Sequence, residues 1–380
     1  MKVFSLFSMF ALSTLLTTQS FADAKMSQTG GYNSTSSNRT QMDSEGPPVP
    51  PNRDIQVHSA HGCLESGFSF QGEFLWWRTV MDDLEYGLKN NAVIADPNNF
   101  PQGQAFSFTV REPDFQFDPG FRFAGGYDFG RDNWDVFLRW TRLYTQASDS
   151  VDQGSGNDIL IPIRVETLSI TQNLGGVALS PYGKVNWDFH FNSLDFEMGY
   201  DYFFSHRFSV RPHMGIKAAW LDMNYRVKYL EALVVSAGDI ETMDGKGDSD
   251  YWAVGPRFGI DSYLHIGWGF SIYGQISGSL LYGRYDTKYD QSVVSTVPGN
   301  GIVVDFDIKQ DDFYRLRSNL QMALGVEWAY CYAGNYLFAL HLGWETQYWW
   351  NQLEMPFFGY FQPDGDLTLS GLTAGARFDF

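Results

Sequence analysis

The ten residues from Gly371 to Phe380 alternate strictly between apolar and small or polar side chains. The apolar positions are Leu372, Ala374, Ala376, Phe378 and Phe380. Because successive side chains of a β-strand point to opposite faces, this alternation predicts a strand with one apolar face and one polar face. Such a strand constrains the fold, since it needs an apolar environment on one side only.

A strand of this kind that closes on an aromatic residue is typical of a transmembrane β-barrel. In such a barrel the last strand pairs with the first, and aromatic residues lie at the membrane interface. The five apolar residues resemble the carboxy-terminal signal by which the barrel-assembly machinery recognises outer-membrane barrels. The alternative is the closing strand of a soluble β-sandwich, and the rest of the chain has to distinguish the two.

The composition favours a membrane barrel. Aromatic residues make up 17% of the 380 residues, yet the mean hydropathy is −0.26. Large rings without overall hydrophobicity suit strands with one apolar and one polar face. Beyond the amino-terminal segment, the sequence has no run of about eighteen apolar residues, so a helical span is not expected. The formal net charge of −18 argues against nucleic acid as a partner.

The amino-terminal part predicts export. Lys2, the apolar run after it and Ser20-Phe21-Ala22 predict a signal peptide over residues 1–22. Residues 23–66 are rich in Ser, Asn and Pro, which predicts a disordered periplasmic lead-in before a barrel over residues 67–380. Cys63 and Cys331 are too few for a disulfide framework, and the sequence leaves open whether they are free, paired or cross-linked.

Ten alternating segments follow one another from Gly67 onward. Their expected ranges are Phe68–Trp76, Phe121–Phe129, Trp134–Thr141, Leu194–Tyr202, Phe208–Trp220, Trp252–Leu264, Phe270–Tyr282, Arg315–Trp328, Tyr336–Tyr348 and Gly371–Phe380. Short turns alternate between them with long polar connections, among them Leu221–Asp250 and Gly283–Asp312. This rhythm is typical of outer-membrane barrels, which have short periplasmic turns and long external loops.

We therefore predict an all-β fold, a transmembrane antiparallel up-and-down β-barrel of ten to fourteen strands, with twelve or more if the lumen conducts. Ser107–Arg111, Ile159–Ile170 and Val185–Phe191 have strand character and could add spans. Tyr225–Val235 and Ile302–Lys309 could instead extend strands above the membrane.

Charged residues occur on the polar faces of the predicted strands. Because Arg or Lys at the lipid-facing midplane costs about 2–4 kcal/mol, these charges are expected on the lumen side. The residues expected to line the pore are Arg139, Arg211, His213, Lys217, Arg257, Arg315, Arg317, Glu327, His341 and Glu345. The pairs Trp76-Trp77 and Trp349-Trp350 are expected in the aromatic girdles at strand ends.

Three stretches carry a family resemblance: Gly72–Tyr86 (GEFLWWRTVMDDLEY), Asp118–Arg142 (DPGFRFAGGYDFGRDNWDVFLRWTR) and Leu194–Trp220. They resemble the pore-forming major outer membrane proteins of the Legionella type, a family that includes such proteins of environmental chlamydiae. The likeness runs from about Phe68 to the carboxy terminus. It implies an abundant porin with a role in contact with host cells.

A barrel with enzyme activity is the alternative to a pore-forming barrel. It would need Ser or Asp beside His near the outer rim of the lumen. His213 and His341 lie on polar faces next to charged residues, which favours lumen histidines held in ion pairs. The lead-in histidines match no zinc spacing, and the acidic cluster around Asp248 lacks the EF-hand order. We expect no enzyme activity, no metal and no cofactor.

The sequence thus predicts a bacterial outer-membrane porin for passive diffusion of small hydrophilic solutes and ions. Fixed charges of both signs in the lumen would set a mild ion preference. The alternative is a non-conducting surface barrel that acts in adhesion or host-cell contact through its external loops. Outer-membrane lipid and the assembly machinery are expected contacts, whereas the solute and the oligomeric state stay open.

Overall fold

The computed structural model describes residues 66–90, 107–129, 133–152, 159–165, 178–234, 238–295, 302–332, 336–356 and 364–380. The elements in these ranges are β-strands. Within the same ranges, no helix is long and apolar enough to cross a membrane. The predicted signal peptide and nearly all of the predicted lead-in lie outside the described residues.

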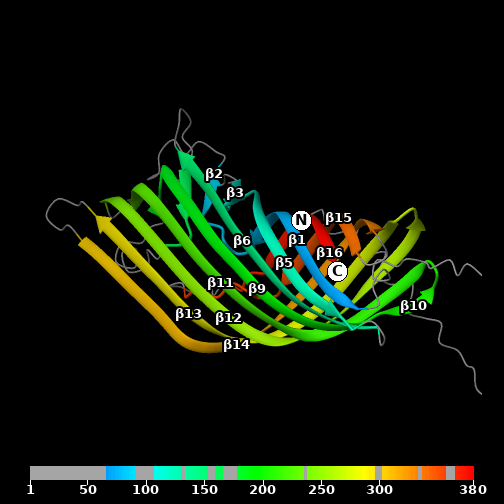
Figure 1. Cartoon of the computed structure of the whole chain (residues 1–380). Coiled ribbons are helices and arrows are strands. Elements are labelled where there is room, and N and C mark those ends of the chain that lie inside the picture. The colour runs from blue at the N-terminus through cyan, green and yellow to red at the C-terminus, as the bar shows by residue number, and fades with distance from the viewer. Residues whose placement is uncertain are drawn as a thin grey trace, which may run out of the picture. The chain divides into compact units, whose positions relative to one another are not determined.

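Ten long strands form the wall of the barrel. They are β1 (Gly67–Met81), β5 (Phe117–Asp128), β6 (Trp134–Asp152), β9 (Tyr182–Tyr200), β11 (Phe208–Val234), β12 (Gly238–Gly267), β13 (Phe270–Ser295), β14 (Ile302–Tyr332), β15 (Tyr336–Trp349) and β16 (Leu367–Asp379). In the part of the chain that the structure describes, each pairs antiparallel with the next in this order, and β16 returns to β1. The sheet is therefore a closed ring (Figure 1).

The predicted fold class is confirmed, at the lower end of the predicted range of strand number. The sequence analysis expected twelve or more wall strands for a conducting lumen, whereas the described residues form ten. Val185–Phe191, considered as an extra span, is the outer part of β9.

Six short strands complete the description. Three lie against the wall: β4 (Asp114–Phe115) pairs with β6, and β8 (Ala178–Leu179) and β10 (Tyr202–Ser205) pair with β11. The other three form a separate small sheet in the order β3 (Phe108–Arg111), β2 (Gly87–Asn90) and β7 (Ile159–Pro162). The predicted segments Ser107–Arg111 and Ile159–Ile170 therefore contribute β3 and β7 and add no membrane span; residues 166–170 lie outside the described part.

The carboxy-terminal stretch forms the seam of the ring. Phe68 N donates to Phe380 O at 2.8 Å, and Phe380 N donates to Phe68 O at 2.9 Å. The Phe70 ring stacks on Phe380 with centroids 5.9 Å apart. The last strand thus closes on the first as the alternation predicts, while the role of these residues as an assembly signal stays a prediction.

The structure bears on the cysteines, which the sequence left open. Cys331, at the turn end of β14, is disulfide-bonded. Cys63 is the other cysteine of the chain and lies outside the described residues.

The wall exposes apolar side chains and buries charged ones. On β11, Met214 and Ile216 are 58% and 54% exposed, whereas Arg211, His213 and Lys217 are buried. This is the reverse of a soluble protein, in which charged residues are almost never fully buried. The outer face of this part of the wall is therefore suited to hydrocarbon, and the charges lie in the interior.

Both faces change character at one level of the wall. Beyond Trp220 the outward positions of β11 become polar, beginning with Asp222, and the inward positions become apolar and buried, as at Tyr225. The register places Trp220 opposite Trp252, so the change occurs at the same level in β12. The external part of the wall therefore has a polar outer face and an apolar core, as a sheet in water does.

This external part corrects the predicted loops. Leu221–Asp250 and Gly283–Asp312 were expected as long polar connections, but most of their residues belong to β11, β12, β13 and β14. The expectation that Tyr225–Val235 and Ile302–Lys309 could extend strands is confirmed for Tyr225–Val234 and for Ile302–Lys309, and Val235 lies outside the described residues. The physical reason is the buried cluster on the inner face, which gives these polar-looking segments a core to pack on.

Candidate functional site

A layer of ion pairs crosses the barrel interior at the level of the apolar outer band. Its members occupy inward positions, which alternate with the lipid-facing positions of the same strands. The side chains that form it are Glu73, Arg122, Asp135, Arg139, Asp195, Glu197, Arg211, His213, Lys217, Arg257, Asp261, Gln321, His341 and Glu345.

Arg122 of β5 holds one side of this layer. Its Nη1 lies 2.7 Å from Glu73 Oε2, and its Nη2 lies 2.7 Å from Glu345 Oε1. Its Nε donates to Thr141 Oγ1 at 2.9 Å. Because β1 and β16 lie between β5 and β15 in the ring, the Arg122–Glu345 pair reaches across part of the lumen.

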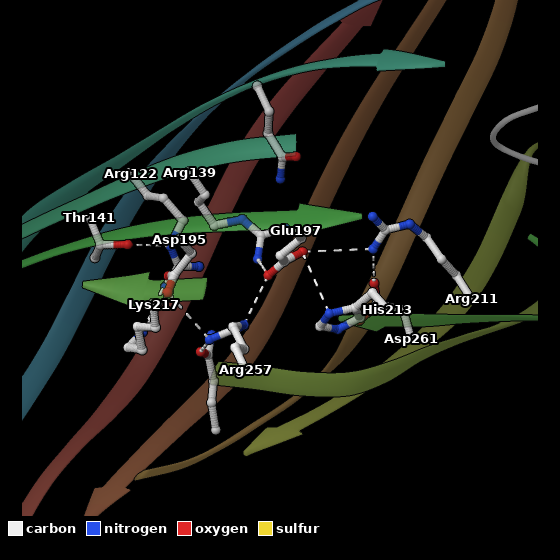
Figure 2. Close-up of polar contacts among 12 residues, drawn as sticks. Arg122, Arg139, Thr141, Asp195, Glu197, Arg211, His213, Lys217, Arg257 and Asp261 are labelled. Atoms are coloured by element: carbon white, nitrogen blue, oxygen red, sulfur yellow. Dashed lines mark hydrogen bonds and ion pairs between the residues drawn. The ribbon is translucent and has the colours of Figure 1, made fainter. Parts of the chain in front are cut away.

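Glu197 of β9 is the shared acceptor on the other side. Its Oε1 lies 3.2 Å from Arg139 Nη1 and 3.0 Å from Arg257 Nε. Its Oε2 lies 3.7 Å from Arg211 Nη1. Figure 2 shows the three arginines converging on this carboxylate from different strands.

Gln321 of β14 links the two groups. It accepts from Arg257 Nη1 at 2.9 Å and donates to Glu345 Oε1 at 2.8 Å. Polar contacts therefore run without interruption from β5 through β15, β14 and β12 to β9. Buried ion pairs are favourable only when such additional hydrogen bonds satisfy their remaining polar atoms.

Lys217 of β11 connects the ion-pair layer to an aromatic layer above it. Its Nζ lies 3.0 Å from Asp195 Oδ1 and 5.8 Å from the centroid of the Trp349 ring. β12, β13 and β14 separate β11 from β15 in the ring. This cation–π contact therefore also spans the lumen.

The aromatic layer crosses the interior at the next level. The rings of Phe191 on β9 and Trp349 on β15 meet edge to face with centroids 5.8 Å apart, and both side chains are 0% exposed. In a ring of ten strands, β9 and β15 are five places apart and therefore lie opposite each other. Side chains from opposite walls are in contact.

Two tryptophans correct the sequence analysis. Trp77 and Trp349 were expected in the aromatic girdles, but both are fully buried in the interior. Alternation was the signal that could have found them, because adjacent residues of one strand cannot both face lipid. Trp76 is 42% exposed and does face outward.

Segments between strands pack into the external end of the interior. Tyr229 Oη donates to Tyr86 O, Tyr289 Oη donates to Arg164 O, and Tyr285 Oη donates to Gln352 O at 3.1 Å. Burial raises the pKa of Tyr229 well above its usual value, so its hydroxyl stays a protonated donor. These hydrogen bonds hold the backbone at Tyr86, Arg164 and Gln352 against the wall strands.

A small polar cavity remains beside the ion-pair layer. Its volume is about 50 Å³, enough for a few water molecules. Arg122, Arg139, Glu327, His341 and Tyr273 are among the residues that line it.

All ten predicted pore-lining residues occupy inward strand positions, but their surroundings differ. Arg139, Arg211, His213, Lys217, Arg257, His341 and Glu345 belong to the ion-pair layer, and Glu327 lines the cavity. Arg317 lies further out, where its Nε is 3.2 Å from Tyr285 Oη. Arg315 is at the rim: its side chain is 44% exposed and its Nε is 3.1 Å from Glu354 Oε1. That these residues line an open pore stays a prediction.

The sequence analysis did not select Glu73, Arg122, Asp195, Glu197 and Asp261 as site residues. Their inward parity was readable from the same alternation. Their pairing was not readable, because it depends on which strands face each other across the ring. In the described ranges, no group of three or more His, Cys, Asp or Glu side chains is arranged to hold a metal ion.

A closed antiparallel barrel with a hydrocarbon-facing band and a charged interior defines an outer-membrane β-barrel protein. Residues 60–380 match the family described as "Legionella pneumophila major outer membrane protein precursor". The chain belongs to this family, which confirms the resemblance seen in the sequence. No curated protein matches the chain.

Solved structures of outer-membrane proteins resemble the chain only distantly. The outer membrane protease OmpT from Escherichia coli is 10% identical, with 83% of this chain and 97% of that chain covered and a TM-score of 0.35. A major outer membrane protein from Thermus thermophilus is 10% identical, with 83% and 99% covered and a TM-score of 0.29. The toluene transporter TodX of P. putida is 9% identical, with 82% and 89% covered and a TM-score of 0.30. Likenesses at this level carry no argument about activity.

Proposed function

We propose that this outer-membrane barrel is closed at rest and acts at the cell surface through the part of its wall beyond the membrane. The contact between Phe191 and Trp349 carries the proposal, because it joins opposite walls. A diffusion porin needs a continuous water-filled path. Here the path meets an ion-pair layer and then an aromatic layer.

The outer face of the external wall supports a role in surface contact. It carries charges of both signs in close pairs, such as Lys246 with Asp248 at 2.6 Å and Lys288 with Asp290 at 2.8 Å. Two grooves of about 570 and 650 Å³ lie among these residues. This favours the non-conducting alternative of the sequence analysis, with strands in place of the expected loops.

The predicted porin remains the second candidate, and the ion-pair layer favours it. Burying paired charges is often no more stabilising than filling the same space with apolar residues. A barrel without any transport role therefore has no evident need for so many charges in its interior. If solutes pass, the aromatic layer has to move first.

Single-channel recording in planar bilayers tests the proposal. Refolded protein should give no defined conductance steps at any salt concentration, whereas Trp349→Ala should give frequent openings because its ring no longer crosses the lumen. Different gel mobility of boiled and unboiled samples verifies that both proteins are folded. Stable steps from the unaltered protein, together with sugar uptake into a porin-deficient strain, would establish the porin instead.

A further inference from the structure

Four cations gather on the outer face of the external wall and form a basic patch. The register places Lys184 of β9 opposite Lys228 of β11, and Arg226 of β11 opposite Lys246 of β12. These three strands lie side by side (Figure 1). Like charges directly opposite each other destabilise a strand pair. In a chain with a formal net charge of −18, two adjacent pairs of opposed cations therefore call for an explanation.

Carboxylates of the wall neutralise the basic patch only in part. Lys246 is held 2.6 Å from a carboxylate of its own strand, but Lys228 Nζ lies 3.9 Å from Asp244 Oδ1. Within the described part of the chain, Lys184 and Arg226 form no ion pair. Both side chains are exposed, and that of Lys228 is 51% exposed. The patch therefore has positive charge available for an anion.

Another pair of opposed cations on the same outer face shows the compensated arrangement. Lys288 of β13 lies opposite Lys309 of β14. Each Nζ lies 2.8 Å from a carboxylate oxygen, that of Asp290 and that of Asp311 respectively. These two lysines thus have counter-charges within the wall, which Lys184 lacks.

The basic patch lines one side of a groove of about 570 Å³. All four of its cations border this groove together with Asn186, which lies opposite Arg226. Three of the carboxylates that also line the groove, Asp290, Asp305 and Asp307, come from β13 and β14, on the side away from β9. The end of the groove at β9 and β11 is therefore the positive end.

Hydroxyl groups continue the patch on the next strand. Ser148 and Ser150 of β6 are exposed and lie directly opposite Asn186 and Lys184. Lysine and arginine form strong charge-assisted hydrogen bonds with phosphate oxygens. Serine hydroxyls and asparagine amides can donate to and accept from sugar hydroxyls. This combination of side chains suits a phosphorylated sugar.

The height of the basic patch excludes phospholipid headgroups as its ligand. Arg226 and Lys228 lie about 20 and 27 Å beyond Trp220 along β11, at about 3.4 Å per residue. A strand tilt of about 40° reduces this to a height of about 15–20 Å. Headgroups extend only about 5–8 Å beyond the hydrocarbon on each side of a bilayer. In the outer leaflet of a bacterial outer membrane, the phosphate-bearing core sugars of lipopolysaccharide extend beyond that level.

We propose that the basic patch binds the phosphorylated core sugars of lipopolysaccharide molecules that surround the barrel. Because the patch lies on the outer face of the wall, it points sideways toward neighbours in the membrane. Lys184 and Arg226 supply the uncompensated charge, and Lys228 adds to it. The inference goes beyond the proposed surface role and holds whether or not the barrel conducts, so the binding test and the conductance test fail separately.

Binding of fluorescently labelled rough lipopolysaccharide, which carries core sugars only, tests the proposal with the folded full-length barrel in detergent. The patch variant combines Lys184→Gln with Arg226→Gln. It should bind at least about tenfold more weakly, because each Lys or Arg near an anionic surface contributes to binding. The matched control combines Lys288→Gln with Lys309→Gln, which removes the same charge from compensated positions. In about 0.1 M salt it should change binding less than about twofold, since charges more than about 10 Å away are screened.

Two further probes identify the source of the anionic group. Dephosphorylated lipopolysaccharide should bind the unaltered barrel about as weakly as intact lipopolysaccharide binds the patch variant. Inositol hexakisphosphate, a soluble polyanion, should bind more weakly than lipopolysaccharide. Different gel mobility of boiled and unboiled samples verifies that each variant is folded. Equal losses in the two variants, or equal binding of dephosphorylated lipopolysaccharide, would overturn the proposal. Tighter binding of inositol hexakisphosphate, lost in the patch variant, would assign the patch to a soluble polyanion instead.

Discussion

Neighbouring residues of this barrel experience opposite environments, and the interior depends on that difference. Trp76 faces lipid, whereas Trp77 is fully buried and donates through Nε1 to Thr373 Oγ1 at 3.2 Å. Two adjacent positions of β1 therefore face different environments, lipid at Trp76 and the barrel interior at Trp77. Substitutions at adjacent positions should therefore differ in their effects.

The central aromatic contact should be a large source of stability. Trp349→Ala should destabilise the barrel by about 3–5 kcal/mol, because it leaves a cavity between opposite walls. The matched control is Trp344→Ala on the same strand, whose side chain is 51% exposed toward lipid. Urea unfolding in detergent micelles measures both changes. Equal losses in the two variants would contradict the cross-lumen contact.

Glu197 should be the most sensitive carboxylate of the ion-pair layer. Its replacement by Gln leaves Arg139, Arg211 and Arg257 buried without their shared counter-charge. Breaking a buried pair costs about 3–5 kcal/mol. Asp312→Asn is the control, since its pair with Arg284 has side chains 67% and 38% exposed and exposed pairs contribute about 0–1 kcal/mol. The unfolding midpoints in urea compare the two, and a smaller loss for Glu197→Gln would be inconsistent with the layer described.

A row of carboxylates outside the membrane should make stability depend on pH: Asp250 lies opposite Asp222 on one neighbouring strand and Asp286 on the other. Partial burial, and then the charges of Asp222, Asp248 and Asp286, raise the pKa of Asp250. A raised pKa means that folding favours the protonated acid, so the ionised carboxylate lowers stability at pH 7. This penalty disappears as the pH falls through the pKa.

Asp250→Asn should therefore stabilise the barrel at pH 7. The expected gain is less than about 1 kcal/mol, because solvent screens the repulsion. Unfolding curves at pH 7 and at lower pH should show the gain shrinking as the pH falls. Asp188→Asn is the control, because its cross-strand neighbours are Asn224 and Gln146. A gain that grows on acidification would refute the assignment.

At the scale of the strand, the alternation of side chains predicted the strands and the direction in which their side chains point. It did not predict contacts between strands on opposite sides of the ring. All ten wall strands and the inward parity of the lumen residues were readable from the sequence. The external half of β12 was not, because its polar outward residues and inward Gly245 and Gly247 are also typical of a loop. The contact of Phe191 with Trp349 depends on strand number and register, which no single strand encodes.

Register itself depends on close backbone approach between strands. A Cβ at Gly215 of β11 would lie 1.8 Å from Phe196 O of β9. Gly215→Ala should therefore destabilise the barrel by about 1–3 kcal/mol. Gly278→Ala on β13 is the control, because its nearest atom would be 3.8 Å away. The temperature at which the folded band disappears from unboiled gels ranks the two, and an equal temperature would contradict the β9–β11 register.

For the whole molecule, both faces of the wall change polarity where the strands leave the membrane and enter water. In the membrane the outer face is apolar and the interior charged; beyond it the outer face is charged and the interior aromatic. Both interior layers join strands that are not neighbours in the sheet, as the contact of Phe191 with Trp349 does across the closed ring. The seam of β1 with β16 completes it.

Fluorine NMR on protein labelled with 5-fluorotryptophan tests this arrangement most directly. The signals of Trp76, Trp77, Trp344 and Trp349 can be assigned by replacing each with Phe. Oxygen dissolved in the lipid should relax Trp76 and Trp344, and a water-soluble gadolinium chelate should relax neither Trp77 nor Trp349. Relaxation of Trp77 and Trp349 by the chelate would mean an open lumen, and no oxygen effect on Trp76 would mean that its face does not meet lipid.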